Sequence, residues 1–358
     1  MSNKFLKFVV FSLVGLAVFL AGYLFSRKSD LTNQQALINN SLVTRFDKTE
    51  EKYSAPTGLF ELTPGEANFP NVSNTGEIQY YVPKNGEIRS ASVKNSAAGS
   101  TLIAKIQPNA SYISWGTNKT LVATYSTGSI FYDLSSNYSK KYDSQIKSPA
   151  LNKAGDKIAY TYFNNESGEG NISIADTKLE SYKNILSTRF AGWQIHWLDN
   201  SHLALLKPPT LENTQYSLFL LDIESGALQN ILDSKGNLEL VWSVGGQKLA
   251  YSYVDIYTQE KGLYYMDLSA KEEVKLKSVV DASRCTWSMD NKTVYCAGTD
   301  SFVSIDTTAP ETTAKEITNP TDADPAANAT NLLLNSTEDY LIFKNSKDGK
   351  LYGLSLSK

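Results

Sequence analysis

Several residue types that carry chemistry are scarce in this sequence. Its 358 residues include two cysteines, two histidines and three methionines, and the formal net charge is −3. A charge so close to neutral, without a long run of Lys or Arg, disfavours a nucleic-acid partner, which would need a basic face. The two cysteines are not spaced as C-x-x-C and have no histidine nearby, which disfavours a redox or metal-binding pair.

The signatures of common enzyme classes are also missing. The sequence has no G-x-S-x-G elbow, P-loop, H-E-x-x-H helix or G-x-G-x-x-G turn after a predicted strand. Asp322 and Asp324 lack the pattern of a calcium loop. His196 and His202 flank a single turn, and His196, next to Trp197, is interpreted as a packed or surface residue. The sequence therefore predicts no catalytic residue, metal site or cofactor, and a protein that is not an enzyme.

What the sequence does contain is a repeat. Residues 237–268 read as three strands, and the first two are joined by a Val-Gly-Gly-Gln turn in which glycine tolerates positive φ. The anchor position of this unit recurs at steps of 36 to 47 residues, and an aspartate that ends the third strand keeps the same spacing. Such a period, with about four strands per unit, is typical of a β-propeller. The anchors are Val72, Trp115, Leu151, Trp197, Trp242, Trp287 and Leu334, and the aspartates are Asp133, Asp176, Asp222, Asp267 and Asp306.

The number of units predicts an all-β fold, a seven-bladed β-propeller over residues 56–358. Six or eight blades remain alternatives because the first unit is degenerate. An isolated strand at residues 57–63 precedes the first unit, and the last unit, from residue 331, has three strands. We therefore expect the early strand to complete the last blade and close the ring. The repeated tryptophans are predicted to pack between blades, and the aspartates to accept hydrogen bonds in the following turn.

Cys285 and Cys296 flank a predicted hairpin. With Asp290 and Asn291 at the turn, the two cysteines face each other on neighbouring strands, close enough for a disulfide. A disulfide in turn indicates an oxidising compartment.

The N-terminal region contains an apolar run. Residues 8–25 are uncharged throughout, and a helix of that length rises about 27 Å, close to the thickness of the hydrocarbon layer. No convincing cleavage site follows, although a cleaved signal peptide and a buried helix are alternatives. We predict a transmembrane signal-anchor at residues 1–28, with 5–26 in the membrane, and a polar linker or stalk at 29–55. The disulfide favours a single-pass protein of a bacterial-type cell membrane, with the propeller on the extracytoplasmic side.

The longer loops are expected on one face of the propeller. They join the second and third strands at residues 163–170, 207–215 and 254–262, and a blade connection at 319–328 lies on the same face. Functional residues concentrate on such loops, and tyrosine offers both apolar area and a hydroxyl. The alternative is that several tyrosines pack between blades. The candidate binding residues on this face are Tyr162, Lys207, Glu212, Tyr253, Tyr257 and Glu260.

The pattern W-S-x-D-G-x-K-x-A-Y followed by L-Y-x-x-D-L resembles the TolB-type, WD-like β-propeller repeat of bacterial envelope proteins. Residues 242–251 with 263–268, 287–295 and 152–160 carry it. The resemblance covers residues 57–358 and implies envelope proteins or peptides as partners. It departs from TolB in having no recognisable α/β domain before the propeller. We expect a non-catalytic protein- or ligand-binding module of the envelope. The alternatives are a propeller hydrolase or lyase with a carboxylate site in the central funnel, and a structural subunit of an envelope complex.

Overall fold

The computed structural model describes residues 56–117, 119–211, 213–255, 257–278, 280–309, 314–318 and 326–356. The predicted membrane anchor and linker lie outside these residues, as does the candidate binding residue Glu212. Within the described ranges, no helix has the length and apolar character needed to cross a membrane.

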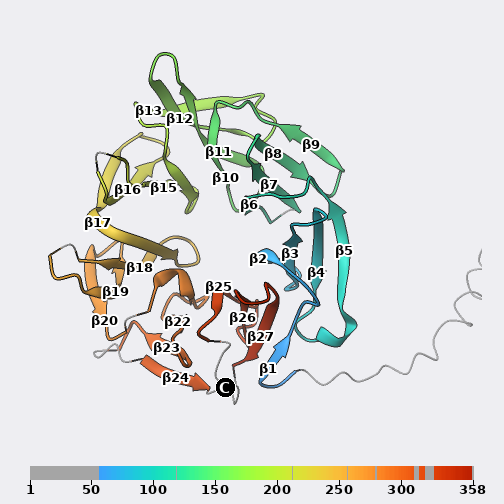
Figure 1. Ribbon diagram of the computed structural model, residues 1–358. Coiled ribbons are helices and arrows are strands. Elements are labelled where there is room, and N and C mark those ends of the chain that lie inside the picture. The colour runs from blue at the N-terminus through green and yellow to red at the C-terminus, as the bar shows by residue number, and fades with distance from the viewer. Residues whose placement is uncertain are drawn as a thin grey trace, which may run out of the picture. The chain divides into compact units, whose positions relative to one another are not determined.

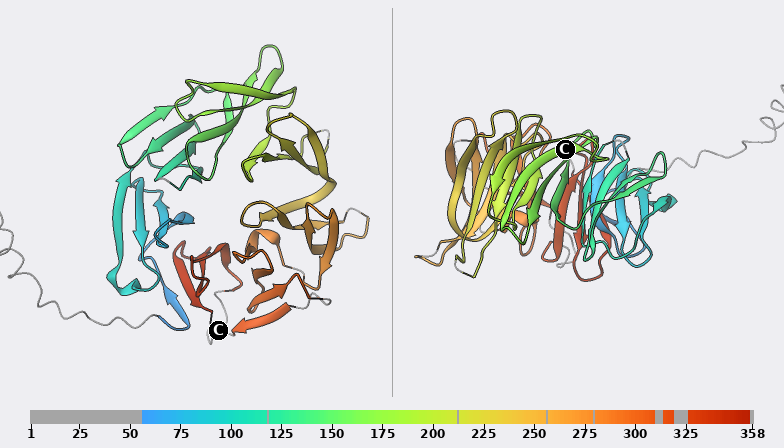
Figure 2. Two further views of the ribbon diagram at one scale, coloured as in Figure 1. Left: turned by 180° about the vertical axis from the view of Figure 1, so that it is seen from behind. Right: turned by 90° about the horizontal axis from the view of Figure 1, so that it is seen from above.

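The described strands form a ring of antiparallel sheets around a central axis (Figure 1), five with four strands and one with seven. The seven-stranded sheet contains two blades, because β17 (Leu228–Trp242) is the outer strand of one and the inner strand of the next. The prediction of an all-β, seven-bladed propeller is therefore confirmed. Figure 2 shows the same ring from behind and from above, with the sheets standing side by side around the axis.

The blades follow one another along the chain. The first contains β2 (Asn68–Val72), β3 (Ile78–Val82), β4 (Glu87–Ala91) and β5 (Ser100–Lys105). The second contains β6 (Tyr112–Trp115), β7 (Thr120–Tyr125), β8 (Gly128–Asp133) and β9 (Tyr138–Lys141). The third contains β10 (Ile146–Leu151), β11 (Lys157–Asn164), β12 (Glu169–Asp176) and β13 (Tyr182–Thr188).

The remaining blades include the shared strand and the closure. The fourth contains β14 (Gln194–Trp197), β15 (His202–Lys207), β16 (Tyr216–Asp222) and the first half of β17. The fifth contains the second half of β17, β18 (Lys248–Val254), β19 (Lys261–Asp267) and β20 (Glu272–Leu276). The sixth contains β21 (Cys285–Trp287), β22 (Thr293–Ala297), β23 (Phe302–Asp306) and β24 (Ala314–Thr318). The seventh contains β25 (Ala329–Leu334), β26 (Tyr340–Asn345), β27 (Leu351–Ser355) and β1 (Leu59–Glu61). Two short 3₁₀ turns lie at Ser96–Ala98 and Ala282–Arg284.

The core lies between the blades, because the second strand of each blade is largely buried on both faces. In β7, Leu121 and Ala123 pack into a cluster shared with the first blade, whereas Val122 points to the third blade. This alternation follows from the two-residue period of a strand. Each such strand therefore links two neighbouring interfaces.

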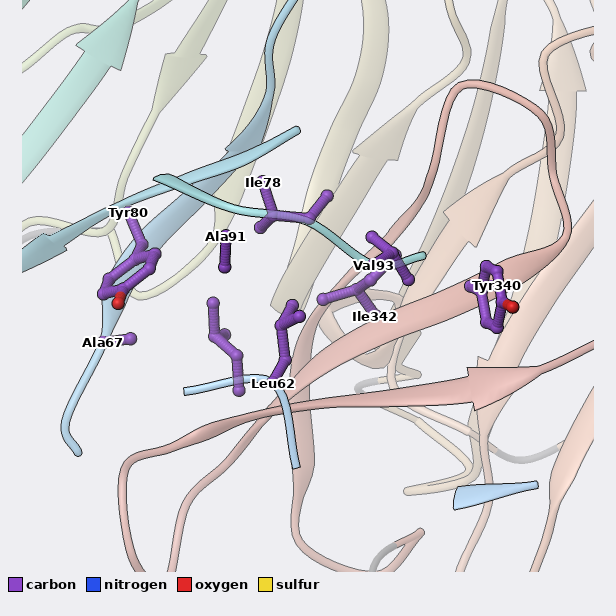
Figure 3. Packing of buried hydrophobic residues seen from close by; sticks show 9 residues of the cluster. Leu62, Ala67, Ile78, Tyr80, Ala91, Val93, Tyr340 and Ile342 are labelled. Atoms are coloured by element: carbon purple, nitrogen blue, oxygen red, sulfur yellow. The ribbon is translucent and has the colours of Figure 1, made fainter. Parts of the chain in front are cut away.

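The ring closes as predicted, through β1. Phe60 pairs with Gly353 of β27, and its ring contacts Tyr340 edge-on at 5.6 Å between centroids. A Cβ atom on Gly353 would clash with the Phe60 ring, so a larger residue there would force that ring to move. Leu62 and Ala67 from the N-terminal segment share one apolar cluster with Ile342 of β26, and Figure 3 shows Leu62 near Ile342 and Ala67 near Tyr80.

The repeated aspartates and the disulfide also match the predictions. Asp133 accepts hydrogen bonds from the backbone N–H and the hydroxyl of Ser135 at 2.9 and 2.6 Å. The hydroxyls of Ser135 and Ser136 lower the pKa of Asp133 to about 2. Cys285 pairs with Cys296 across β21 and β22, and the two form a disulfide. The same turn bonding occurs at Asp176, Asp222, Asp267 and Asp306.

The ring closure depends on one buried hydroxyl. Thr63 is 1% exposed; its hydroxyl accepts the Leu351 N–H at 2.9 Å and donates to the Gly65 carbonyl at 3.0 Å. We predict that Thr63→Val lowers the free energy of unfolding by about 1–3 kcal/mol, because it leaves a buried N–H without an acceptor. Chemical denaturation measures this effect. The exposed Thr101→Val is the matched control and should change stability by less than about 0.5 kcal/mol; equal effects for both variants would contradict the prediction.

Candidate functional site

Residues of four blades line a cavity of about 780 Å³, most of them on the inner strands β6, β10, β14 and β17 and the others on β7, β15 and β16. A second cavity of about 390 Å³ shares Tyr112, Ile195, His196 and Trp242 with the first. His196 and Trp242 therefore lie where the two cavities meet. The polar or aromatic side chains that line the larger cavity are Tyr112, Thr124, Ser148, Gln194, His196 and Trp242.

Strand alternation directs His196 into the cavity. In β14, the exposed residues Gln194 and His196 flank the buried Ile195, so their side chains lie on the opposite face of the strand. The Ser148 hydroxyl accepts the Ile195 N–H at 3.0 Å and joins β10 of the third blade to β14. This bond holds β14 in place beside the cavity.

His196 lies against Trp242 of the neighbouring blade. The two rings are nearly parallel, with 8° between their planes and 6.3 Å between centroids. Among the residues that the structure describes, no hydrogen-bond partner is found for either ring nitrogen of His196 or for the indole N–H of Trp242. The Tyr112 hydroxyl and the Gln194 amide likewise have none within the described ranges. Four polar groups from three blades are thus available to a ligand.

Trp242 differs from the other tryptophans of the repeat. Trp115 donates its indole N–H to the Phe69 carbonyl at 2.8 Å, Trp197 to Asp199 at 2.7 Å, and Trp287 to Val241 at 3.1 Å. All four nevertheless pack between blades as predicted, and Trp242 lies against the core cluster that the fourth and fifth blades share. Its half-buried ring also borders both cavities.

The surroundings of His196 favour its neutral form. The enclosing blades disfavour the charged imidazolium and lower the pKa of His196 below its ordinary value. The ring is nevertheless exposed to the cavity, and this contact with solvent limits the lowering. At neutral pH the imidazole is therefore unprotonated and can accept a proton.

The residues that line the larger cavity carry no carboxylate, lysine or arginine. Lys153 borders the smaller cavity. Across the described part of the chain, no group of three or more His, Cys, Asp or Glu side chains is arranged to hold a metal ion. The cavity can thus offer a proton acceptor, neutral hydrogen-bond donors and an aromatic surface.

None of the five described binding candidates lines either of these two cavities. Tyr257 and Tyr162 are exposed, at 89% and 41%. Tyr253 stacks on Tyr264 at 4.9 Å between centroids, and the Lys235 ammonium lies 4.0 Å from its ring. The ring of Tyr253 therefore packs against its neighbours, which agrees with the alternative that several tyrosines are packing residues.

The other two described candidates, Lys207 and Glu260, also line neither of the two cavities. The Lys207 ammonium lies 5.4 Å from the Phe190 ring centroid. Glu260 borders a separate depression beside Lys261. As binding residues, all six candidates remain predictions.

Sequence reasoning missed His196, Gln194 and Tyr112. The available signal was their position in the first strand of a unit, on the face opposite the core residues. Motif searches could not detect the group, because Tyr112 comes from the second blade, far in sequence from Gln194 and His196 on β14.

No protein-family model and no curated protein sequence matches this chain. Solved structures do match. An oligogalacturonate lyase in complex with manganese has a TM-score of 0.63 and 11% identity, covering 86% of this chain and 96% of that one. The oligogalacturonate lyase of Vibrio parahaemolyticus has a TM-score of 0.59 and 10% identity, covering 84% and 94%. TolB of Acinetobacter baumannii matches at a TM-score of 0.36 and 14% identity, covering 66% and 59%.

The chain has a TolB-like β-propeller fold. At these identities, the likeness to the solved structures shows the fold alone. The predicted resemblance is therefore confirmed for the architecture.

The comparisons correct two further expectations. The protein was expected to be no enzyme and to act as a non-catalytic binding module, but the two lyases that match over most of this chain are enzymes. The expectation was wrong because it rested on missing contiguous motifs, whereas a propeller can build a site from single residues of separate blades.

We predict unequal effects when two tryptophans of the repeat are shortened. Trp287→Phe should lower the free energy of unfolding by about 1–3 kcal/mol, because it removes a buried indole and the donor to the Val241 carbonyl. Trp242→Phe should cost less than about 1 kcal/mol, since its N–H has no partner in the described structure and its ring borders a cavity. Denaturant titration of both variants measures the difference. A larger loss for Trp242→Phe than for Trp287→Phe would contradict the prediction.

Proposed function

We propose that this protein is a propeller lyase that cleaves a hexuronate oligosaccharide in its central channel by β-elimination, with His196 as the base. The observation that carries the proposal is the neutral, unpartnered imidazole of His196 against Trp242 at the junction of two cavities. The fold shared with two oligogalacturonate lyases supports the choice of reaction. The sequence analysis gave a lyase with a carboxylate site as an alternative. The proposal keeps the lyase reaction and replaces the carboxylates with a histidine, because the cavity lining contains His196 and no carboxylate.

The aromatic surface suits a sugar ring. A pyranose has an apolar C–H face and a polar rim, and aromatic side chains pack against apolar faces while nearby donors bind hydroxyls. Trp242 supplies the surface, and Gln194 and Tyr112 supply hydrogen bonds to the rim. These contacts would place the sugar within reach of His196.

In the elimination, His196 takes the proton from C5 of the uronate. The C5–H electron pair forms the C4=C5 double bond, and the bond between C4 and the glycosidic oxygen breaks. The imidazolium then returns the proton to the departing oxygen. Negative charge develops on the carboxyl oxygens at C6 during this step, and the N–H of Trp242 and the O–H of Tyr112 are the donors available to stabilise it.

Manganese, present with one of the matching lyases, does not fit the donors of this channel. The cavity lining offers one imidazole and no carboxylate, whereas manganese is commonly held by several oxygen or imidazole ligands. The proposed steps therefore use the side chains of this chain alone.

We also propose that the protein is anchored through residues 5–26, with the propeller on the extracytoplasmic side of the membrane. The disulfide between Cys285 and Cys296 supports an oxidising compartment. There the channel would have access to polysaccharides outside the cytoplasm. The long-loop face remains the predicted contact surface for envelope proteins or peptides, and no nucleic-acid partner is expected.

We predict that His196→Gln lowers kcat on oligogalacturonate-type substrates by at least about 100-fold, because it removes the base. The ultraviolet absorbance of the unsaturated product measures the rate. His202→Gln is the matched control: His202 is bound to Asp199 at 3.1 Å outside both cavities, so this variant should keep its activity. Full activity in folded His196→Gln would overturn the assignment of the base.

The pH dependence follows from the lowered pKa of His196. Because the base form is active, we predict that kcat/KM rises with pH, with a midpoint below about 6.5, the ordinary histidine value. It should then stay level through neutral pH. A pH–rate profile of the purified propeller measures the midpoint, and a midpoint above neutral would indicate a different base.

A further inference from the structure

We infer that the sugar unit cleaved in the channel is an uncharged uronate ester, such as a methyl ester, rather than a free uronate. This inference rests on the proposed lyase function and specifies its substrate class. It starts from the charge and polarity of the cavity wall.

The larger cavity has no charged side chain among the residues that line it. Four leucines of the fourth and fifth blades line it: Leu206 and Leu240 are half-buried and face the cavity, whereas Leu218 and Leu238, 1% and 6% exposed, belong to the core behind them. A free carboxylate at this wall would lose water without gaining a cation, which is strongly unfavourable. An ester has no charge to desolvate, and its alkyl group can pack against the leucines.

The chemistry of elimination leads to the same substrate. Removing C5–H beside a carboxylate puts a second negative charge on the same group, which requires a nearby cation. The larger cavity lacks Lys and Arg, and the described residues lack a metal-binding cluster. Removing C5–H beside an ester creates a single negative charge on the carbonyl oxygen, which neutral donors can stabilise.

The available donors match that requirement. Trp242 offers one N–H, Tyr112 one O–H and Gln194 two N–H groups, all of them neutral and without partners in the described part of the chain. The step balances without any co-reactant: His196 takes the C5 proton, C4=C5 forms, the C4–O bond breaks, and the imidazolium protonates the leaving oxygen. The ester remains intact on the unsaturated product.

Lys153 is the one cation on the wall of the smaller cavity. Its side chain is exposed, and it does not line the larger cavity. A free carboxylate could be recognised only through this residue among the described lining. Lys153 therefore provides a direct test of the competing interpretation.

The first experiment compares one oligogalacturonate preparation in its methyl-esterified and saponified forms, with the purified protein and no added metal. We expect kcat/KM for the ester to exceed that for the free acid by more than about tenfold, because the acid has no counter-charge in the cavity. Calorimetric binding to His196→Gln should show the same preference without turnover. Lys153→Gln should leave the ester rate unchanged.

A charge-insertion pair sharpens the test. Gln194→Arg places a cation on the exposed cavity-facing side of β14 and should shift the preference towards the free acid. Gln247→Arg adds the same charge at an exposed turn outside both cavities and should leave the preference unchanged. Equal shifts in the two variants would contradict a cavity-based discrimination.

The outcomes separate the two proposals. Preferential cleavage of the free acid, lost in Lys153→Gln, overturns the ester inference and leaves the lyase proposal standing. Tighter binding of the ester without cleavage of either form overturns the lyase proposal and keeps the inferred ligand class. Neither binding nor cleavage of either form overturns both.

Discussion

The structure depends on one constraint: the second strand of each blade is buried between the two neighbouring blades. Leu121 and Val122, adjacent in β7, serve different interfaces, so no blade is complete alone. The pairing of β1 with β27 supplies the last interface, and Thr63, Phe60 and Gly353 are the residues that make it fit. Closure by the chain's own early strand removes the open sheet edge that a linear array would expose.

The same constraint frees the inner strands for function. Their side chains alternate between the blade interfaces and the channel, so channel-facing positions can vary without loss of core. The fourth and fifth blades use this freedom: β14 places His196 in the channel, and Trp242 of β17 meets it there. The residues around His196 and Trp242 decide which reaction this pair can support. They are neutral hydrogen-bond donors and an apolar wall without an ionic group.

The periodic features were predictable because they reflect local chemistry repeated along the chain. The aspartates that end third strands bond their own turns, and the cysteines pair across a tight hairpin, so short sequence separations were sufficient. The site was not predictable in this way. Gln194, His196, Trp242 and Tyr112 come from three blades, and their common position appears only when the ring is closed. The tyrosine-rich loops drew attention because they are unusual in sequence, yet none of the five described binding candidates lines either of the two cavities.

The sequence by itself determined the all-β class, the seven units, the closing strand and the disulfide. Strand alternation, turn chemistry and the repeat are all encoded within neighbouring residues. The tertiary structure alone decided which repeated tryptophan donates its indole N–H to a carbonyl and which has no partner for it in the described structure. Trp242 and Trp287 occupy the same place in their units. Trp287 donates its indole N–H to the Val241 carbonyl of the preceding blade, whereas the ring of Trp242 stacks on His196 of its preceding blade. That difference depends on the neighbouring blade, so the residues that flank each tryptophan in the sequence do not predict it.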